Sequence, residues 1–150
     1  MIGRLIGIDH GLVRIGVAVS DPSGLVAREL TVITRKSKAE DFARLNQIAQ
    51  EQAAIGFVIG LPYEEHAPED QYTQADKVKT WVGRFAETTS LPYIFWNETL
   101  SSIDAAELAR QKRRKPSEPI DDLAARIILQ SYLDALRDGL AALPVPRETD

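Results

Sequence analysis

The chain has 150 residues, of which 44% are hydrophobic and 27% are charged, and its formal net charge is −4. This is the size and composition of one soluble domain with a single core. The absence of cysteine excludes a disulfide framework, a thiolate nucleophile and any cysteine-based metal site, and it fits a reducing, cytoplasmic location. We expect neither secretion nor membrane insertion, because no apolar run reaches the ~18 residues of a membrane span.

Three strands are predicted in the first part of the chain. Residues 4–9 and 14–20 are rich in β-branched residues and flank the turn-prone pair His10-Gly11, which indicates a β-hairpin. Residues 25–34 add a third strand, which we expect to run antiparallel to the second.

Helices and strands alternate in the rest of the chain. From Ser37, a candidate N-cap, the apolar residues take helical spacing. Residues 56–60 are wholly apolar, the pattern of a strand buried on both faces, and should lie beside the first strand. A helix over 71–88, a strand over 92–96 and helices over 102–112 and 119–136 follow.

This order predicts an α/β fold with a five-stranded mixed sheet, three antiparallel strands and then two parallel ones, flanked by helices. We expect one domain over residues 1–138 and a flexible C-terminal tail over residues 139–150.

Three acids stand at ends of the predicted elements. Asp9 ends the first strand, Glu98 follows the fifth strand, and Asp121 begins the last helix. Open α/β sheets place ligands in the crevice beyond the carboxyl ends of their parallel strands. A cluster of carboxylates there would suit Mg²⁺ or Mn²⁺ better than zinc. Each acid also has an ordinary structural explanation, in a turn, in a loop or at the positive end of a helix dipole.

Positive charge is concentrated in two short stretches, although the chain as a whole is acidic. Taken alone, each cluster is explained by solvated charge on a loop. A basic loop just before the last helix would also suit a polyanionic partner. The larger stretch holds Arg110, Lys112, Arg113, Arg114 and Lys115, and the smaller one holds Arg35, Lys36 and Lys38.

Five segments carry a likeness to a known family. "GIDHGLVRIGVAVSD", "VIGLP", "QADKVKTW", "FWNETLSS" and "IDDLAARIILQSYLD" occur in this order within residues 5–134. Together they resemble the YqgF family of pre-16S rRNA nucleases, also described as Holliday-junction-resolvase-like proteins with a ribonuclease-H-like fold. No single segment is specific, but five in the right order make a strong match.

The resemblance implies a metal-dependent nuclease that processes the 5′ end of pre-16S rRNA. The family's catalytic acids match Asp9, Glu98 and Asp121, which would hold two Mg²⁺ or Mn²⁺ ions, while Asp122 is a reserve ligand. RNA, within a ribosome precursor, is favoured over branched DNA as the partner.

Substrate contacts are expected from three arginines. Arg14 matches the family's basic residue before "IGVAV", and Arg113 and Arg114 come from the basic stretch before Asp121. His10 stands where the family often has proline or an aromatic residue; it could contact substrate, but we expect it to be a solvated turn residue.

The chain departs from the family in ways that bear on substrate affinity or specificity. Asn97 and Thr99 replace an acid and an arginine beside Glu98, and the loop over residues 64–70 is unusually acidic.

Other functions remain compatible with the sequence. A Holliday-junction-type DNA resolvase and a non-catalytic RNA- or ribosome-binding module that retains the fold are the alternatives. An actin-like or sugar-kinase-like ATPase shares the Asp-x-Gly hairpin but needs two such lobes, and this chain has room for one.

Overall fold

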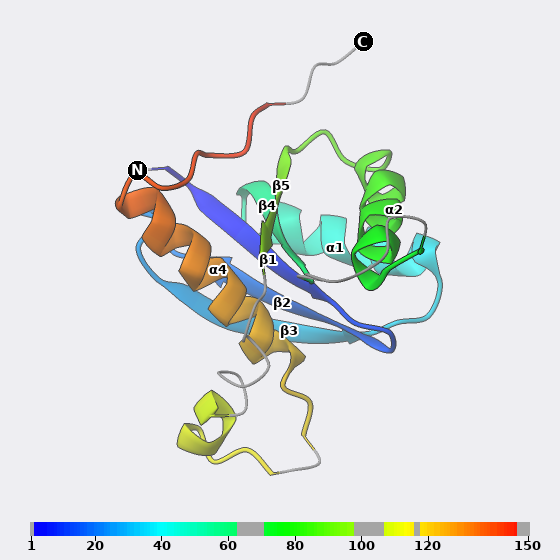
Figure 1. Ribbon diagram of the computed structural model, residues 1–150, viewed down its shortest axis with the longest axis horizontal. Helices are drawn as coiled ribbons and strands as arrows, with labels where there is room; N and C mark the ends of the chain where they lie inside the picture. The colour runs from blue at the N-terminus through cyan, green and yellow to red at the C-terminus, as the bar shows by residue number, and fades with distance from the viewer. Residues whose placement is uncertain (1, 63–70, 98–106, 116–117, 147–150) are drawn as a thin grey trace.

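The structure is a computed structural model and describes residues 2–62, 71–97, 107–115 and 118–146 (Figure 1). Five strands form one sheet in the spatial order β3-β2-β1-β4-β5. The pairs β1–β2 and β2–β3 are antiparallel, and β1–β4 and β4–β5 are parallel. The predicted mixed sheet is therefore confirmed. The strands are β1 (Arg4–His10), β2 (Arg14–Ser20), β3 (Ala27–Thr34), β4 (Ala54–Leu61) and β5 (Tyr93–Asn97).

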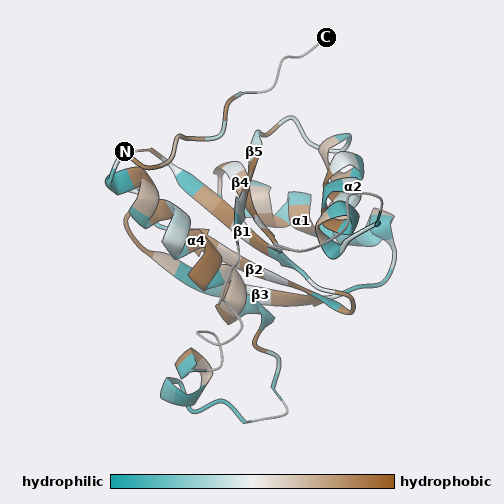
Figure 2. Ribbon diagram, viewed as in Figure 1, coloured by the Kyte–Doolittle hydropathy of each residue, from teal (hydrophilic) through white to brown (hydrophobic). Residues whose placement is uncertain are grey.

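Helices cover both faces of this sheet. Figure 1 shows α1 (Lys38–Glu51) and α2 (Gln74–Ala86) on one face and α4 (Asp121–Arg137) on the other. Each face has its own hydrophobic cluster, one built with α1 and α2 and the other with α4. The centre of the sheet is therefore buried on both sides, which explains why the sequence of β4 is almost wholly apolar. In Figure 2 the central strands are largely brown, while teal residues lie on the helices.

Side chains along β1 alternate strictly between the two faces. Ile6 and Ile8 pack with α1 and α2, whereas Leu5 packs with α4. A strand has a period of two, so Asp9 faces α4 and His10 faces α2. This alternation sends two neighbouring polar residues to opposite sides of the sheet.

Local sequence signals fix where two helices begin. The Ser37 side chain accepts a hydrogen bond from the Glu40 backbone nitrogen, so the predicted N-cap of α1 is confirmed. The hydroxyl of Thr73 and the carboxylate of Asp76 form a capping box at the start of α2. Of the helix predicted over 102–112, residues 107–111 are helical, and the first part lies outside the described residues.

The segment that follows α4 returns to the sheet. The hydroxyl of the buried Tyr132 donates a hydrogen bond to the carbonyl of Ala142, and Ala141 packs against the α4 cluster. Within the described ranges, no helix has the length and apolar character needed to cross a lipid bilayer.

Candidate functional site

The first turn of α4 rests on β2 at Gly16. Gly16 is the register partner of Asp9 on β1. A Cβ on Gly16 would overlap the carbonyl of Asp121 and would lie 2.8 Å from the backbone nitrogen of Asp122. Only glycine permits this approach of two backbones, so the residue opposite Asp9 decides where α4 begins.

The side chain of Asp9 is directed to the same face of the sheet. Gly7, two residues earlier on β1, lies directly under α4, because a Cβ there would be 2.8 Å from the Cβ of Leu129. Strand alternation gives Asp9 the same orientation, and its residue is half-buried. Asp9 and Asp121 therefore share one face and one end of the sheet; the sequence predicted the shared end but not the shared face.

Arg14 joins this acidic pair. Its Nε donates to Oδ2 of Asp121 at 3.1 Å, and the two side chains are 43% and 21% exposed. Oδ1 of Asp121 points toward the β1–β2 turn, where it would lie 3.6 Å from a Cβ on Gly11. The site thus offers carboxylate oxygens and one guanidinium group, which suit a cation and a phosphate group respectively.

The third predicted acid, Glu98, lies outside the described residues, as do Thr99 and the acidic stretch 64–70. The strand leading to Glu98 is described as far as Asn97, whose register partner is Leu61 on β4. Within the described part of the chain, no group of three His, Cys, Asp or Glu side chains is arranged to hold a metal ion.

Asp122, predicted as a reserve ligand, forms a buried pair with Arg114. The guanidinium binds both carboxylate oxygens, at 2.7 and 3.0 Å, and also donates to the Pro119 carbonyl at 2.9 Å. The side-chain exposures are 19% for Arg114 and 11% for Asp122. The hydrogen bonds to Asp122 raise the pKa of Arg114 above its ordinary value. In this structure, then, Asp122 and Arg114, predicted as a metal ligand and a substrate contact, bind each other.

A second cluster attaches the basic stretch to the sheet. Lys112 and Arg126 bind the two carboxylate oxygens of Glu29 on β3, at 2.6 and 3.0 Å. Burial raises the pKa of Glu29, but the hydrogen bonds from Lys112 and Arg126 outweigh it and lower the value to about 2. Arg113, between these contacts, is exposed and adopts a positive φ of 58°. Of the two arginines predicted to contact substrate from this stretch, Arg113 is the one exposed to solvent.

His10 differs from its prediction. We expected a solvated turn residue, but its ring packs against Trp81 of α2 with 4.6 Å between the ring centroids. The expectation is wrong because β1 continues through His10 and turns its side chain toward α2. Burial, followed by the charge of Arg35, lowers the pKa of His10 to about 4. The alternation Ile6, Ile8, His10 was the signal that could have revealed this orientation.

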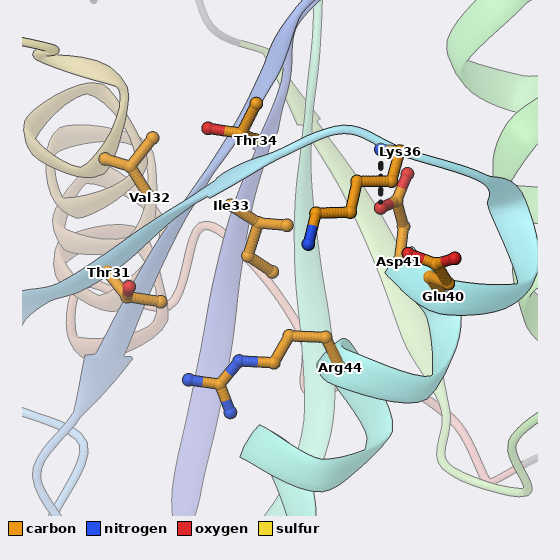
Figure 3. A pocket seen from close by; sticks show the side chains of 8 residues that line it. All are labelled: Thr31, Val32, Ile33, Thr34, Lys36, Glu40, Asp41 and Arg44. Atoms are coloured by element: carbon orange, nitrogen blue, oxygen red, sulfur yellow. Dashed lines mark hydrogen bonds between the residues drawn. The ribbon is translucent and has the colours of Figure 1, made fainter.

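The structure also has a cavity outside this site. A space of about 560 Å³ lies between the edge strand β3 and α1, on the face opposite α4. Figure 3 shows Lys36 and Arg44 reaching into the space beside Ile33. Glu40 and Asp41 also line it, so its charge is mixed. Its position on the other face separates it from Asp9 and Asp121.

Known sequences resemble this chain over nearly its whole length. The sequence pattern of the family RuvX, described as Holliday junction resolvase, matches residues 3–135. A protein of Thermoanaerobacter pseudethanolicus is 39% identical over 139 residues, covering 90% of this chain and 99% of the relative. One from Rhodopseudomonas palustris is 40% identical over 140 residues, covering 89% and 83%. Both relatives are named as candidate pre-16S rRNA nucleases.

Solved structures are similar in fold. RuvC of T. thermophilus in complex with a Holliday junction substrate superposes with a TM-score of 0.62 at 19% identity, covering 95% of this chain and 99% of RuvC. The Fowlpox virus resolvase, also complexed with Holliday junction DNA, gives a TM-score of 0.54 at 10% identity, covering 89% and 98%. These likenesses confirm the ribonuclease-H-like fold expected from the sequence.

Proposed function

The chain belongs to the RuvX family of nucleases, the family called YqgF above, and from that premise we propose that it hydrolyses phosphodiester bonds of pre-16S rRNA with divalent metal ions. The names of its curated relatives support the choice of RNA. The single observation that carries the proposal is the seating of α4 on Gly16, which brings Asp121 to the end of the sheet that Asp9 occupies.

The donor set fits a hard cation. Asp9 and Asp121 supply carboxylate oxygens on one face, and we propose that Glu98 completes the set. Mg²⁺ or Mn²⁺, in a pair of ions, would stabilise negative charge on the phosphate oxygens and lower the pKa of water. Asp122 is a poorer candidate for a ligand because Arg114 already binds both of its oxygens.

The remaining groups of the site act on the substrate. Arg14 stands beside Asp121 with 43% of its side chain exposed, so its guanidinium can bind a phosphate oxygen while Asp121 holds its orientation. Arg113 is exposed next to Arg114, the partner of Asp122, and would add a second, weaker phosphate contact.

Cleavage of branched DNA is the second candidate. The family description names Holliday junction resolution, and RuvC and the Fowlpox virus enzyme were solved with that substrate. Those two structures are below 20% identity to this chain, whereas the relatives named for rRNA are near 40%. We therefore place RNA first and DNA second.

The test is a cleavage assay with two substrates. Wild type, Asp9→Asn and Asp138→Asn are incubated with 5′-extended pre-16S rRNA or a four-way DNA junction, in Mg²⁺, Mn²⁺ or chelator. Asp138 is exposed and follows the last residue of α4. Asp138→Asn therefore removes one negative charge, as Asp9→Asn does, but at the end of α4 opposite Asp121. We expect cleavage of the RNA that chelator abolishes, that Asp9→Asn lowers by about 100-fold or more because an amide is a poor ligand for a hard cation, and that Asp138→Asn leaves unchanged.

Each other result has a definite meaning. Cleavage of the junction alone would replace the RNA proposal with resolvase activity. Cleavage that survives Asp9→Asn or chelator would overturn the proposed site. If neither substrate is cut and Mn²⁺ fails to raise the melting temperature, the nuclease proposal fails and the non-catalytic binding module takes its place as the hypothesis to test.

A further inference from the structure

A small basic cavity lies on the face of the sheet opposite Asp9 and Asp121. Its volume is about 220 Å³, and it lies where the β1–β2 turn meets the first turns of α1 and α2. The residues of its lining that matter here are Arg35, Lys38, Lys77, Leu12, His10 and Trp81.

The charge of this cavity is positive and is not neutralised by the described acids. Lys38 and Lys77 form no salt bridge with any carboxylate in the described ranges, and both are exposed. Arg35 donates through Nη1 to the carbonyls of Gly11 and Leu12, which fixes its guanidinium beside the turn. Three cations therefore converge on one small space.

Two acids on the helices beside the cavity already accept hydrogen bonds. Asp41 on α1 accepts a hydrogen bond from the Lys36 backbone nitrogen. Asp76 on α2 binds the backbone nitrogen and the hydroxyl of Thr73 in the capping box. Within the described ranges neither carboxylate forms a salt bridge, so neither is paired with a cationic group of the cavity.

Two residues of the lining also carry buried nitrogens without a partner in the described part of the chain. Trp81 is only 3% exposed, and its Nε1 has no hydrogen-bond partner in the described part of the chain. The two ring nitrogens of His10, in contact with Trp81, are also buried without a partner there. Buried polar groups are rarely left unpaired, and an unpaired indole N–H needs an acceptor.

We propose that this cavity binds the phosphate group of a nucleotide unit. Phosphate oxygens supply the acceptors that three cations require, and they carry the opposite charge. The volume lies below the roughly 300–1,000 Å³ of sites for drug-sized ligands, so it suits one phosphate and its sugar. Leu12, 73% exposed at the rim, offers an apolar surface to that sugar.

The site is independent of the proposed cleavage, because it lies across the sheet from the acids and its test measures binding alone. Two sources could supply the phosphate group, a free nucleotide or a strand of nucleic acid that crosses the β1–β2 turn. Experiments with both kinds of probe distinguish them.

The two tryptophans provide a direct measurement. The indole N–H of Trp96, on the α4 face, donates to Ser131, whereas Trp81 is one of the residues that line the basic cavity. The ¹⁵N-labelled chain is titrated at low salt with inorganic phosphate, adenosine monophosphate or a short single-stranded RNA. The Trp81 indole signal, assigned with Trp81→Phe, should shift with each phosphate-bearing probe that binds, while the Trp96 signal should stay in place. Adenosine, which lacks the phosphate group, should shift neither.

Charge variants provide the matched control. Lys38→Gln combined with Lys77→Gln should raise the dissociation constant by about tenfold or more, because two charge-assisted contacts are lost. Lys79→Gln removes one positive charge from an exposed position on α2 that does not line the cavity. It should change the dissociation constant by less than about twofold.

The outcomes separate clearly. Adenosine monophosphate binding as tightly as RNA assigns the cavity to a free nucleotide, and much tighter binding of RNA, with a steep salt dependence, assigns it to a strand. The proposal is overturned if no phosphate-bearing probe moves the Trp81 signal, or if Lys79→Gln weakens binding as much as the double variant does. Either result leaves the cleavage assay unaffected, so failure of this site is distinct from failure of the nuclease.

Discussion

The carbonyl of Asp121 occupies the space that a side chain on Gly16 would need. This contact joins the start of α4 to the turn end of the N-terminal hairpin, where Gly16 is the register partner of Asp9. The position of α4, and with it the spacing of the two acids, depends on the absence of one methyl group.

Replacing Gly16 with alanine should therefore displace α4. We expect Gly16→Ala to lower the free energy of unfolding by about 1–3 kcal/mol, the usual cost of overpacking, and to abolish cleavage. Urea denaturation measures the first effect and the nuclease assay the second. Gly83→Ala is the control, because a Cβ at that position on α2 would have no atom within 4 Å; it should stabilise the chain by about 0.5–1 kcal/mol. Wild-type stability in Gly16→Ala would contradict the close contact.

The Arg114–Asp122 pair should contribute stability rather than metal binding. Asp122→Asn leaves a largely buried guanidinium without its counter-charge and should lower the free energy of unfolding by about 3 kcal/mol in chelator. Arg114→Lys should also destabilise, since lysine cannot bind both oxygens. If the stabilisation by Mn²⁺ disappears in Asp122→Asn, Asp122 is a metal ligand after all.

Arg14 should affect substrate binding more than folding. Its pair with Asp121 is partly exposed, so Arg14→Gln should change the free energy of unfolding by less than about 1 kcal/mol. Loss of one phosphate contact should weaken RNA binding and reduce the slope of log K against log salt by about 1. Fluorescence anisotropy over a range of salt concentrations measures both. An unchanged slope would remove Arg14 from the substrate interface.

Glu29 should make stability depend on acid pH. Its pKa is lowered from 4.5 to about 2, so the folded chain keeps the ionised form that the unfolded chain loses first. The resulting stability is complete above about pH 4.5, declines as pH falls and is lost below about pH 2. Relative to Glu29→Gln, wild type should be more stable by about 2–3 kcal/mol at neutral pH, and the difference should vanish near pH 2. Chemical denaturation of both proteins over that range tests this; a difference independent of pH would refute it.

The sequence predicted the sheet well because its strands carry strong local signals. The apolar run of β4 indicated a central position, and Ser37 marked the start of α1. The face on which Asp9 lies follows from counting along β1 in steps of two. These features depend on residues that are neighbours in the chain, so they can be predicted from a single sequence.

Other features depend on residues that meet only in the folded chain. Nothing in the basic stretch indicated that Arg114 binds Asp122 or that Lys112 binds Glu29, because the path of residues 107–115 over α4 and β3 decides both pairs. The prediction for His10 was wrong because it gave more weight to the neighbouring turn than to the alternation of β1. Trp81, whose ring contacts His10, lies on a helix far along the sequence.

The placement of α4 has a consequence for how the chain is made. Protein synthesis delivers the hairpin with Asp9 before the helix with Asp121, and β4, the parallel partner of β1, emerges between them. A growing chain that has not reached α4 carries one acid without the other and leaves Leu5 and Ala18, which pack with α4, uncovered. Whatever chemistry the acid pair supports therefore begins only after α4 has been synthesised.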